Sequence, residues 1–179
     1  MTPHNPNYPT CDLTFGSLCV LSGDMHPQEV TSLLGINPTK SQVVGESRAS
    51  GRRRIVNKLS GWFLSSEGVL SSKDSRDHLD WLLTKLNGKD DAIAEIHKRG
   101  WQAYFFFYWS SLSGHGGPTL SPPQMKRLAD LDLEISFDCY FNNDEEIGEQ
   151  AGTRQPATRL ESKSEASDKP QPESEGRSR

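Results

Sequence analysis

The segment WQAYFFFYW, residues 101–109, decides the fold. Such a density of aromatic side chains suits the pleated surface of a β-strand and disfavours a helix. Side chains alternate between the two faces of a strand, so one face carries Trp101, Ala103, Phe105, Phe107 and Trp109. The other face carries Tyr104, Phe106 and Tyr108. In a sheet that helices cover on one side only, the first set faces the helices and the second set stays open.

A strand followed by a helix occurs twice in this chain. PQEVTSLLGI at residues 27–36 and PPQMKRLADL at residues 122–131 share one apolar register. Each follows a strand-like apolar run, at residues 13–21 and 101–109. Proline suits the first turn of a helix, and glycine suits its end. The repeat predicts two related β-α halves.

The remaining segments complete the expected order β-α-β-β-α-β-α-β. A short strand at residues 43–46 leads into a polar, basic loop at residues 48–58, and another strand follows at residues 61–65. Asp74 or Ser75 then caps an amphipathic helix with His78 on its solvent side. Its apolar stripe consists of Leu79, Leu82, Leu83 and Leu86. A helical segment at residues 90–99 and an alternating strand at residues 133–141 follow.

The composition changes after Asn142, where Glu, Ser, Pro, Lys, Arg and Gln dominate. Such a segment buries too little apolar surface to offset the entropy of ordering it, so we expect a disordered tail at residues 143–179. The domain then spans residues 10–142, after a flexible arm at residues 1–9. The predicted fold is a single α+β domain with an antiparallel or mixed sheet of about five strands, helices mainly on one face and pseudo-duplicated β-α halves.

That order of elements, together with several short motifs, resembles the bacterial family known as domain of unknown function 4279. The motifs are LGINPT at residues 34–39, Gly45-Glu46, Gly61-Trp62 and the alternating strand around Phe137-Asp138. The resemblance covers nearly all of the predicted domain. It implies a compact α/β module, bacterial and cytoplasmic, with no known activity. The tail and the insertion GRRR at residues 51–54 fall outside the family pattern.

Charge and composition narrow the functional classes. The chain carries 24 Asp and Glu against 20 Lys and Arg, so no global positive field holds a polyanion, which disfavours nucleic-acid binding. No apolar run approaches the roughly 20 residues of a membrane span, and residues 1–10 lack the features of a signal peptide. Cys11, Cys19 and Cys139 form no CxxC pair, and we interpret them as reduced structural thiols of a cytoplasmic protein. The five histidines lack metal-ligand spacing, so we expect no metal and no cofactor.

Three groups of residues are candidates for a site. The first consists of the aromatic residues on the face away from the helices, Tyr104, Phe106 and Tyr108. They form a docking patch if that face is open, or they pack under the N-terminal arm or the basic loop. The second consists of consecutive basic residues, Arg52, Arg53 and Arg54. They suit phosphates or an acidic partner, the alternatives being a solvated surface or contact with the acidic tail.

The third group, Glu46, His115 and Asp138, contains the polar residues that a catalytic or ligand-binding cleft would use. We expect a small non-enzymatic module that binds a protein partner through the open face or the basic loop. An immunity-type protein, which neutralises a toxin of the same cell, is one such module. The alternatives are an enzyme or small-molecule binder that uses the third group, and weak nucleic-acid binding through the arginines. The sequence leaves the oligomeric state open.

Overall fold

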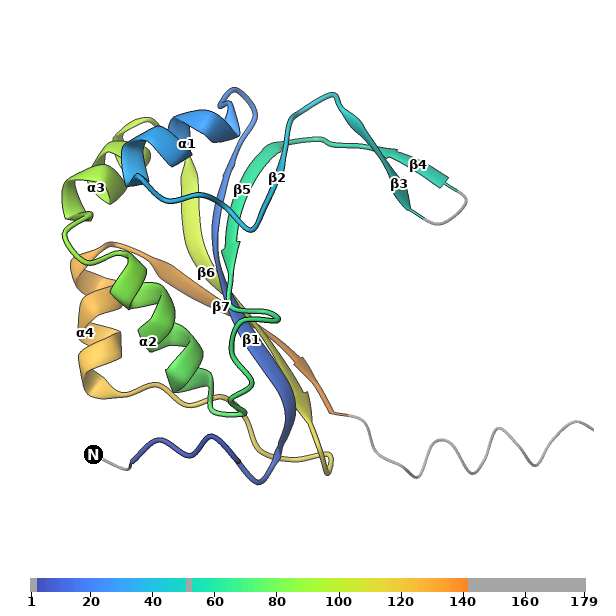
Figure 1. Ribbon diagram of the computed structural model, residues 1–179, viewed down its shortest axis with the longest axis vertical. Coiled ribbons are helices and arrows are strands. Elements are labelled where there is room, and N and C mark those ends of the chain that lie inside the picture. The colour runs from blue at the N-terminus through green and yellow to red at the C-terminus, as the bar shows by residue number, and fades with distance from the viewer. Residues whose placement is uncertain (1–2, 51–52, 142–179) are drawn as a thin grey trace, which may run out of the picture. The chain divides into compact units, whose positions relative to one another are not determined.

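Five strands form the main sheet: β1 (Cys11–Ser22), β2 (Lys40–Gln42), β5 (Ser60–Ser65), β6 (Gln102–Ser111) and β7 (Glu134–Tyr140). Their order is β2-β5-β1-β6-β7 (Figure 1). The central strand β1 is antiparallel to β5 and β6, whereas β7 is parallel to β6. The sheet is therefore mixed. The computed structural model describes residues 3–50 and 53–141, of which residues 48–50 and 53 are described by their backbone alone.

Four helices lie on one face of this sheet (Figure 1). They are α1 (Pro27–Leu34), α2 (Ser75–Lys85), α3 (Asp90–Lys98) and α4 (Pro122–Asp130). The predicted α+β fold, with helices mainly on one face, is confirmed. The two predicted halves are β1 with α1 and β6 with α4, and their strands pair along nearly their whole length. The predicted tail at residues 143–179 lies outside the described residues.

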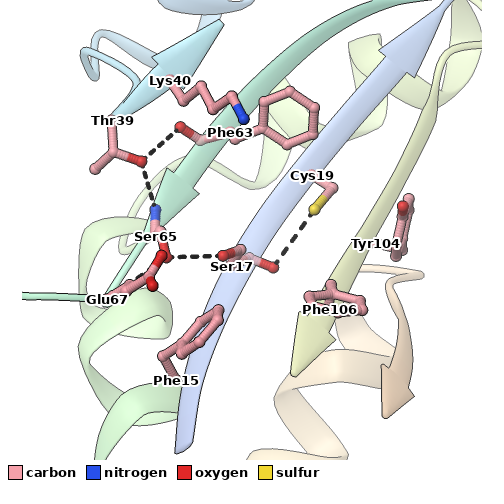
Figure 2. Close-up of a pocket in the computed structure, with 10 residues that line it drawn as sticks. All are labelled: Phe15, Ser17, Cys19, Thr39, Lys40, Phe63, Ser65, Glu67, Tyr104 and Phe106. Atoms are coloured by element: carbon pink, nitrogen blue, oxygen red, sulfur yellow. Dashed lines mark hydrogen bonds between the residues drawn. The ribbon is translucent and has the colours of Figure 1, made fainter. Parts of the chain in front are cut away.

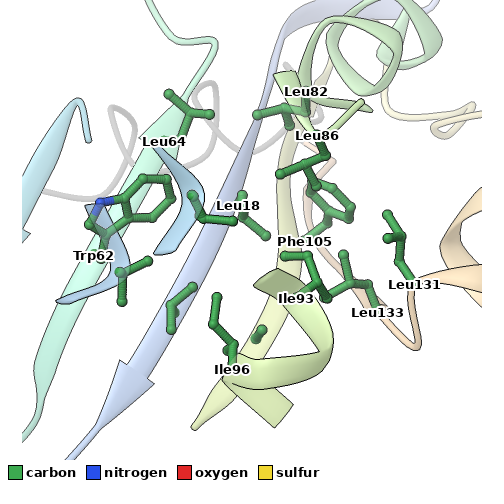
Figure 3. Close-up of a cluster of buried hydrophobic side chains, with 14 of the residues drawn as sticks. Leu18, Trp62, Leu64, Leu82, Leu86, Ile93, Ile96, Phe105, Leu131 and Leu133 are labelled. Carbon is green, nitrogen blue, oxygen red and sulfur yellow. The ribbon is translucent and has the colours of Figure 1, made fainter. Parts of the chain in front are cut away.

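The core fills the space between the sheet and the helices (Figure 3). Strands β1, β5 and β6 contribute Leu18, Trp62 and Phe105, and all three side chains are fully buried. The helices α2 and α3, with the residue that caps the end of α2, contribute aliphatic side chains at helical spacing, Leu79, Leu82, Leu86, Ile93 and Ile96. Each such side chain stabilises the fold by about 1.5–3 kcal/mol when it is fully buried. One face of the strands is therefore packed, and the opposite face is left for other contacts.

Local sequence signals set the ends of the helices. The backbone N–H of His26 donates to Oε1 of Glu29 at 2.9 Å, which fixes the start of α1. Gly35 ends this helix with φ 63°, a left-handed conformation that favours glycine. The backbone N–H of Ser121 donates to Oε1 of Gln124 at 2.9 Å, so α4 begins in the same way. Both helices of the repeat therefore start and end where the sequence predicts.

The predicted strand at residues 43–46 and the predicted loop at residues 48–58 are both wrong. A turn follows β2 instead, because Gly45 has φ 80°, a value that interrupts a strand. This turn leads into an antiparallel hairpin of β3 (Ser47–Ser50) and β4 (Arg53–Val56). The apolar residues Ile55 and Val56 of the hairpin are exposed. The hairpin side chains that the structure describes, at residues 47 and 54–56, are exposed, so no buried apolar alternation marks them and their sequence looks like that of a loop.

The side chain of His78 is fully buried, so the expectation that it lies on the solvent side of α2 is wrong. Its Nδ1 lies 2.8 Å from Oγ of Ser66, and its Nε2 lies 2.7 Å from the carbonyl oxygen of Ser72. Both partners belong to the segment between β5 and α2. That segment covers a side of the helix that the periodicity of α2 alone marks as exposed.

The N-terminal segment contacts the start of α2. The backbone N–H of Asn5 donates to Oδ2 of Asp74 at 2.8 Å, and the guanidinium of Arg76 donates to the carbonyl oxygen of Pro3 at 3.1 Å. The arm predicted for residues 1–9 is thus attached to the domain at these points. Its flexibility stays a prediction, and residues 1–2 lie outside the described residues.

Candidate functional site

The face of the sheet opposite the helices carries the alternate residues of β5, β1 and β6. Strand pairing arranges them in rows, Phe63 with Cys19 and Tyr104, Ser65 with Ser17 and Phe106, and Phe15 with Tyr108. The three residues of this face on β6 are half-buried, whereas Phe105 and Phe107 between them are buried against the helices. The alternation predicted for residues 101–109 is confirmed.

A pocket of about 530 Å³ lies on this face (Figure 2). Its volume falls within the roughly 300–1,000 Å³ of typical ligand sites. The lining residues come from strands β1, β5 and β6, from the start of β2 with the residue before it, and from the segment after β5. They are Phe15, Ser17, Cys19, Thr39, Lys40, Phe63, Ser65, Glu67, Tyr104 and Phe106. Segments far apart in the sequence therefore meet in one concave surface.

Aromatic rings form the apolar part of the pocket. Tyr104 and Phe106 project from β6, and they lie across β1 from Phe63 of β5 (Figure 2). Phe15 stacks on Tyr108, with ring centroids 5.1 Å apart and ring planes at 9°. This stacking positions Phe15 at one end of the pocket. Rings held in this way offer a large apolar contact area to a ligand, at little entropic cost on binding.

Three hydroxyl groups form the polar part of the pocket. Oγ of Ser17 donates to Oγ of Ser65 at 2.9 Å. Oγ1 of Thr39 donates to the carbonyl oxygen of Phe63 at 3.0 Å and accepts from the backbone N–H of Ser65 at 2.9 Å. These bonds fix the orientation of the hydroxyl groups. Oγ of Ser65 also accepts from the backbone N–H of Glu67 at 3.1 Å, so the oxygens of Ser17 and Thr39 are the ones that retain capacity to accept a further hydrogen bond.

Two charges of opposite sign stand at the rim of the pocket. Lys40 extends beside Phe63, and Glu67 lies beside Ser65 (Figure 2). Both side chains are exposed, and neither forms an ion pair with another residue in the described part of the chain. A partner that carries one negative and one positive group would therefore complement this rim.

The cysteine of the pocket is not a nucleophile at neutral pH. Burial raises the pKa of the Cys19 thiol to about 11, against a smaller opposing effect of its hydrogen bond with Tyr104. Burial, followed by the proximity of Cys19, also raises the pKa of Tyr104. Both groups are thus protonated under physiological conditions, and their chemistry suits contact with a ligand better than covalent or general-base catalysis.

Glu46, His115 and Asp138 do not come together. Glu46 follows the turn after β2, at one edge of the sheet, whereas Asp138 lies on β7, at the other edge. Four strand spacings separate these edges, which amounts to roughly 19 Å. Nδ1 of His115 lies 3.1 Å from the carbonyl oxygen of Ser113 in its own loop. None of the three lines the pocket described above.

The arginine residues and Tyr108 also lie away from the pocket. Arg52 is outside the described residues, and so is the side chain of Arg53. Arg54 belongs to the hairpin, where its Nε donates to Oγ of Ser47 at 2.6 Å. Tyr108 is on the open face but supports the pocket from outside, through its stacking on Phe15.

The sequence reasoning missed most of the lining residues on β1, β5 and the segment before β2. A signal for part of them is present, because the period of two places Phe15, Ser17 and Cys19 on one face of the first strand. The register with β5 and β6 is not visible in the sequence. No pattern in the sequence assigned Lys40 or Glu67 to a pocket on this face.

Within residues 3–50 and 53–141, no helix combines the length and the apolar character that crossing a bilayer requires. No group of three or more His, Cys, Asp or Glu side chains in the same part of the chain is arranged to hold a metal ion.

The fold and the pocket define a class of α+β domain in which helices cover one face of a mixed sheet and a ligand-sized cavity opens on the other. The model of the family described as "Domain of unknown function (DUF4279)" matches residues 13–142. The chain belongs to this family, as the sequence motifs predict. No curated protein and no solved structure matches the chain.

Proposed function

We propose that this protein is a non-enzymatic interaction module that binds a protein partner on the open face of its sheet. The observation that carries the proposal is the pocket of about 530 Å³ with four aromatic rings around hydrogen-bonded hydroxyl groups. In protein interfaces a few buried aromatic anchors supply most of the binding free energy. The pocket suits an apolar or aromatic side chain of the partner, with Lys40 and Glu67 contacting charged groups around it.

The chemistry of the pocket supports binding rather than catalysis. Its thiol and its phenol have raised pKa values, and its hydroxyl groups are engaged in hydrogen bonds within the domain. We place the module in the cytoplasm, because Cys11, Cys19 and Cys139 form no disulfide. An immunity-type protein is one form of this function, with a toxin as the partner.

The test begins with the identification of the partner. An amine-reactive crosslinker is applied in cells, and mass spectrometry selects proteins linked through Lys40 at the rim of the pocket. The partner is then purified, and its dissociation constant is measured with the wild-type chain and with the double variant Tyr104→Ala, Phe106→Ala. We expect about 100-fold weaker binding, because each lost anchor is worth on the order of 1–2 kcal/mol.

A matched control removes two exposed apolar side chains outside the pocket. Val69 and Met125 are 54% and 50% exposed and line no part of the pocket. The variant Val69→Ala, Met125→Ala should bind as the wild type does. Equal affinity of the wild type and the Tyr104, Phe106 variant, with both cooperatively folded, would refute the proposal.

The volume of the pocket favours a second candidate, a small-molecule binder that uses the same cavity. An aromatic anion such as 8-anilinonaphthalene-1-sulfonate is a suitable probe, since its rings match the aromatic walls and its sulfonate matches Lys40. Saturable binding of the probe to the folded wild type, lost in the Tyr104, Phe106 variant, supports this candidate. Binding retained by the variant excludes the pocket as the site of the probe.

A further inference from the structure

The two edges of the main sheet are protected to different degrees. One edge is β2, which has three residues, includes Lys40 and runs into a turn. The other edge is β7, a regular seven-residue strand whose register with β6 has no irregularity. Lysine, proline, bulges and short length are the usual means by which proteins prevent an edge strand from pairing. Strand β7, with the sequence EISFDCY, has none of these four, although it carries the charged residues Glu134 and Asp138.

The outer side of β7 is open in the described part of the chain, where β6 is its sole partner strand. In a parallel pair the backbone N–H and C=O groups of alternate residues point away from the neighbouring strand, so a row of donors and acceptors is unpaired. Apolar rings accompany this row. Phe137 is 36% exposed, Tyr140 46% and Phe141, just after the strand, 50%.

We infer that β7 pairs with β7 of a second copy of this chain in an antiparallel manner, so that the two sheets join into one continuous sheet. A twofold axis perpendicular to the sheet relates the copies, and both open faces then lie on the same side. The occupant of the edge is thus another copy of the same strand, which brings the same pattern of donors and acceptors.

The charges of β7 select one register. With Phe137 opposite Phe137 of the partner subunit, all seven residues of the strand are paired, and Glu134 lies opposite Tyr140 of the partner subunit. Ser136 then lies opposite Asp138 of the partner subunit. A shift of the centre to Ser136 places Glu134 opposite an aspartate, and a shift to Asp138 places two aspartates opposite each other. Like charges directly opposite destabilise a strand pair, so the register with the most pairs is also the one of these three that places no like charges directly opposite each other.

Substitutions of opposite charge at Ser136 test this register. By symmetry, Ser136→Asp places two carboxylates opposite the two Asp138 side chains of the dimer, whereas Ser136→Lys places two ammonium groups there. The dissociation constant of the dimer of the full chain is measured by sedimentation equilibrium. We expect it to rise about tenfold or more for Ser136→Asp and to fall for Ser136→Lys. Thermal melting of dilute samples checks that both variants are folded.

A crosslink gives an independent measurement. Residues directly opposite in an antiparallel pair have Cα atoms about 4.5–5.5 Å apart, which matches the geometry of a disulfide. The variant Phe137→Cys, Cys139→Ser should therefore form a disulfide-linked dimer under mild oxidation, and a reducing agent should reverse it. Met125→Cys with Cys139→Ser is the control. It places a thiol on α4 at a position that is 50% exposed, against 36% for Phe137, and should stay uncrosslinked.

The inference is independent of the proposed function, because the residues of the pocket are not on β7. The Tyr104→Ala, Phe106→Ala variant should form the dimer as the wild type does. A chain that is monomeric up to about 1 mM overturns the inference. So does a dimer whose dissociation constant responds equally to both substitutions at Ser136, or to neither.

Discussion

The ion pair between Asp74 and Arg76 is the sharpest test of how the domain is held together. Oδ2 of Asp74 lies 2.6 Å from a terminal nitrogen of Arg76, and the two side chains are 1% and 6% exposed. Oδ1 of Asp74 also accepts from the backbone N–H of Arg76 at 3.0 Å, which caps α2. Asparagine has the same shape and is also a good cap. Asp74→Asn removes the negative charge and replaces one acceptor oxygen by an NH2 group, which cannot accept the hydrogen bonds that Oδ2 receives from Asn5 and Arg76.

This substitution removes the carboxylate with which the buried guanidinium of Arg76 forms an ion pair, whereas the hydrogen bond to the carbonyl oxygen of Pro3 is unaffected. Removal of one partner of a buried pair costs about 3–5 kcal/mol of the free energy of unfolding. In a domain of this size the melting temperature falls by roughly 10–20 °C as a result. Urea unfolding at pH 7 gives the free energy, and calorimetry gives the melting temperature.

An exposed pair of the same type provides the control. Arg127 donates to both carboxylate oxygens of Asp90, at 2.6 and 3.0 Å, but Asp90 is 55% exposed. Solvent screens such a pair, so Asp90→Asn should have a much smaller effect. The reasoning fails if Asp74→Asn unfolds within a few degrees of the wild type, or if it loses no more stability than Asp90→Asn.

Three further predictions follow from single residues. Burial raises the pKa of Asp74, but hydrogen bonds from Arg76 and the backbone, together with the charge of Arg76, outweigh it and hold the pKa below its usual value. The unfolded chain therefore takes up the proton first, so the stabilising effect is complete above about pH 5 and is lost as the pH falls through the folded-state pKa. The stability difference between the wild type and Asp74→Asn, measured by urea unfolding from pH 7 to pH 3, should shrink, and a constant difference contradicts the assignment. Gly16→Ala places a Cβ 2.5 Å from the buried ring of Phe107, so we expect the free energy of unfolding to fall by about 1–3 kcal/mol. The control Gly117→Ala meets no atom within 4 Å and should be nearly neutral. Equal urea midpoints of the two variants would show that the Phe107 ring moves aside. The pKa of the Cys19 thiol is raised to about 11, so this thiol should react with iodoacetamide at pH 8 far more slowly in the folded protein than in 6 M guanidinium chloride. Peptide mapping measures the two rates. Equal rates would place the thiol in solvent.

Much of the fold follows from local sequence signals. The alternation at residues 101–109 and the proline and glycine at the ends of α1 depend on neighbours within one turn or one strand. Their predictions are confirmed. The error for His78 occurs where residues outside the helix decide the structure, because Ser66 and Ser72 supply the cover of this side chain. The periodicity of a helix does not record which other segment packs on it.

The sequence by itself determined which side chains share a face of each strand, because alternation is a property of the extended backbone. Tyr104 and Phe106 were assigned to the open face on that basis alone. Only the tertiary structure decided what these rings meet. The pairing of β6 with β1, of β1 with β5 and of β5 with β2 brings Phe15, Ser65 and Lys40 around them. Such pairing closes long loops and is selected by the packing of the whole sheet, so no local pattern specifies it.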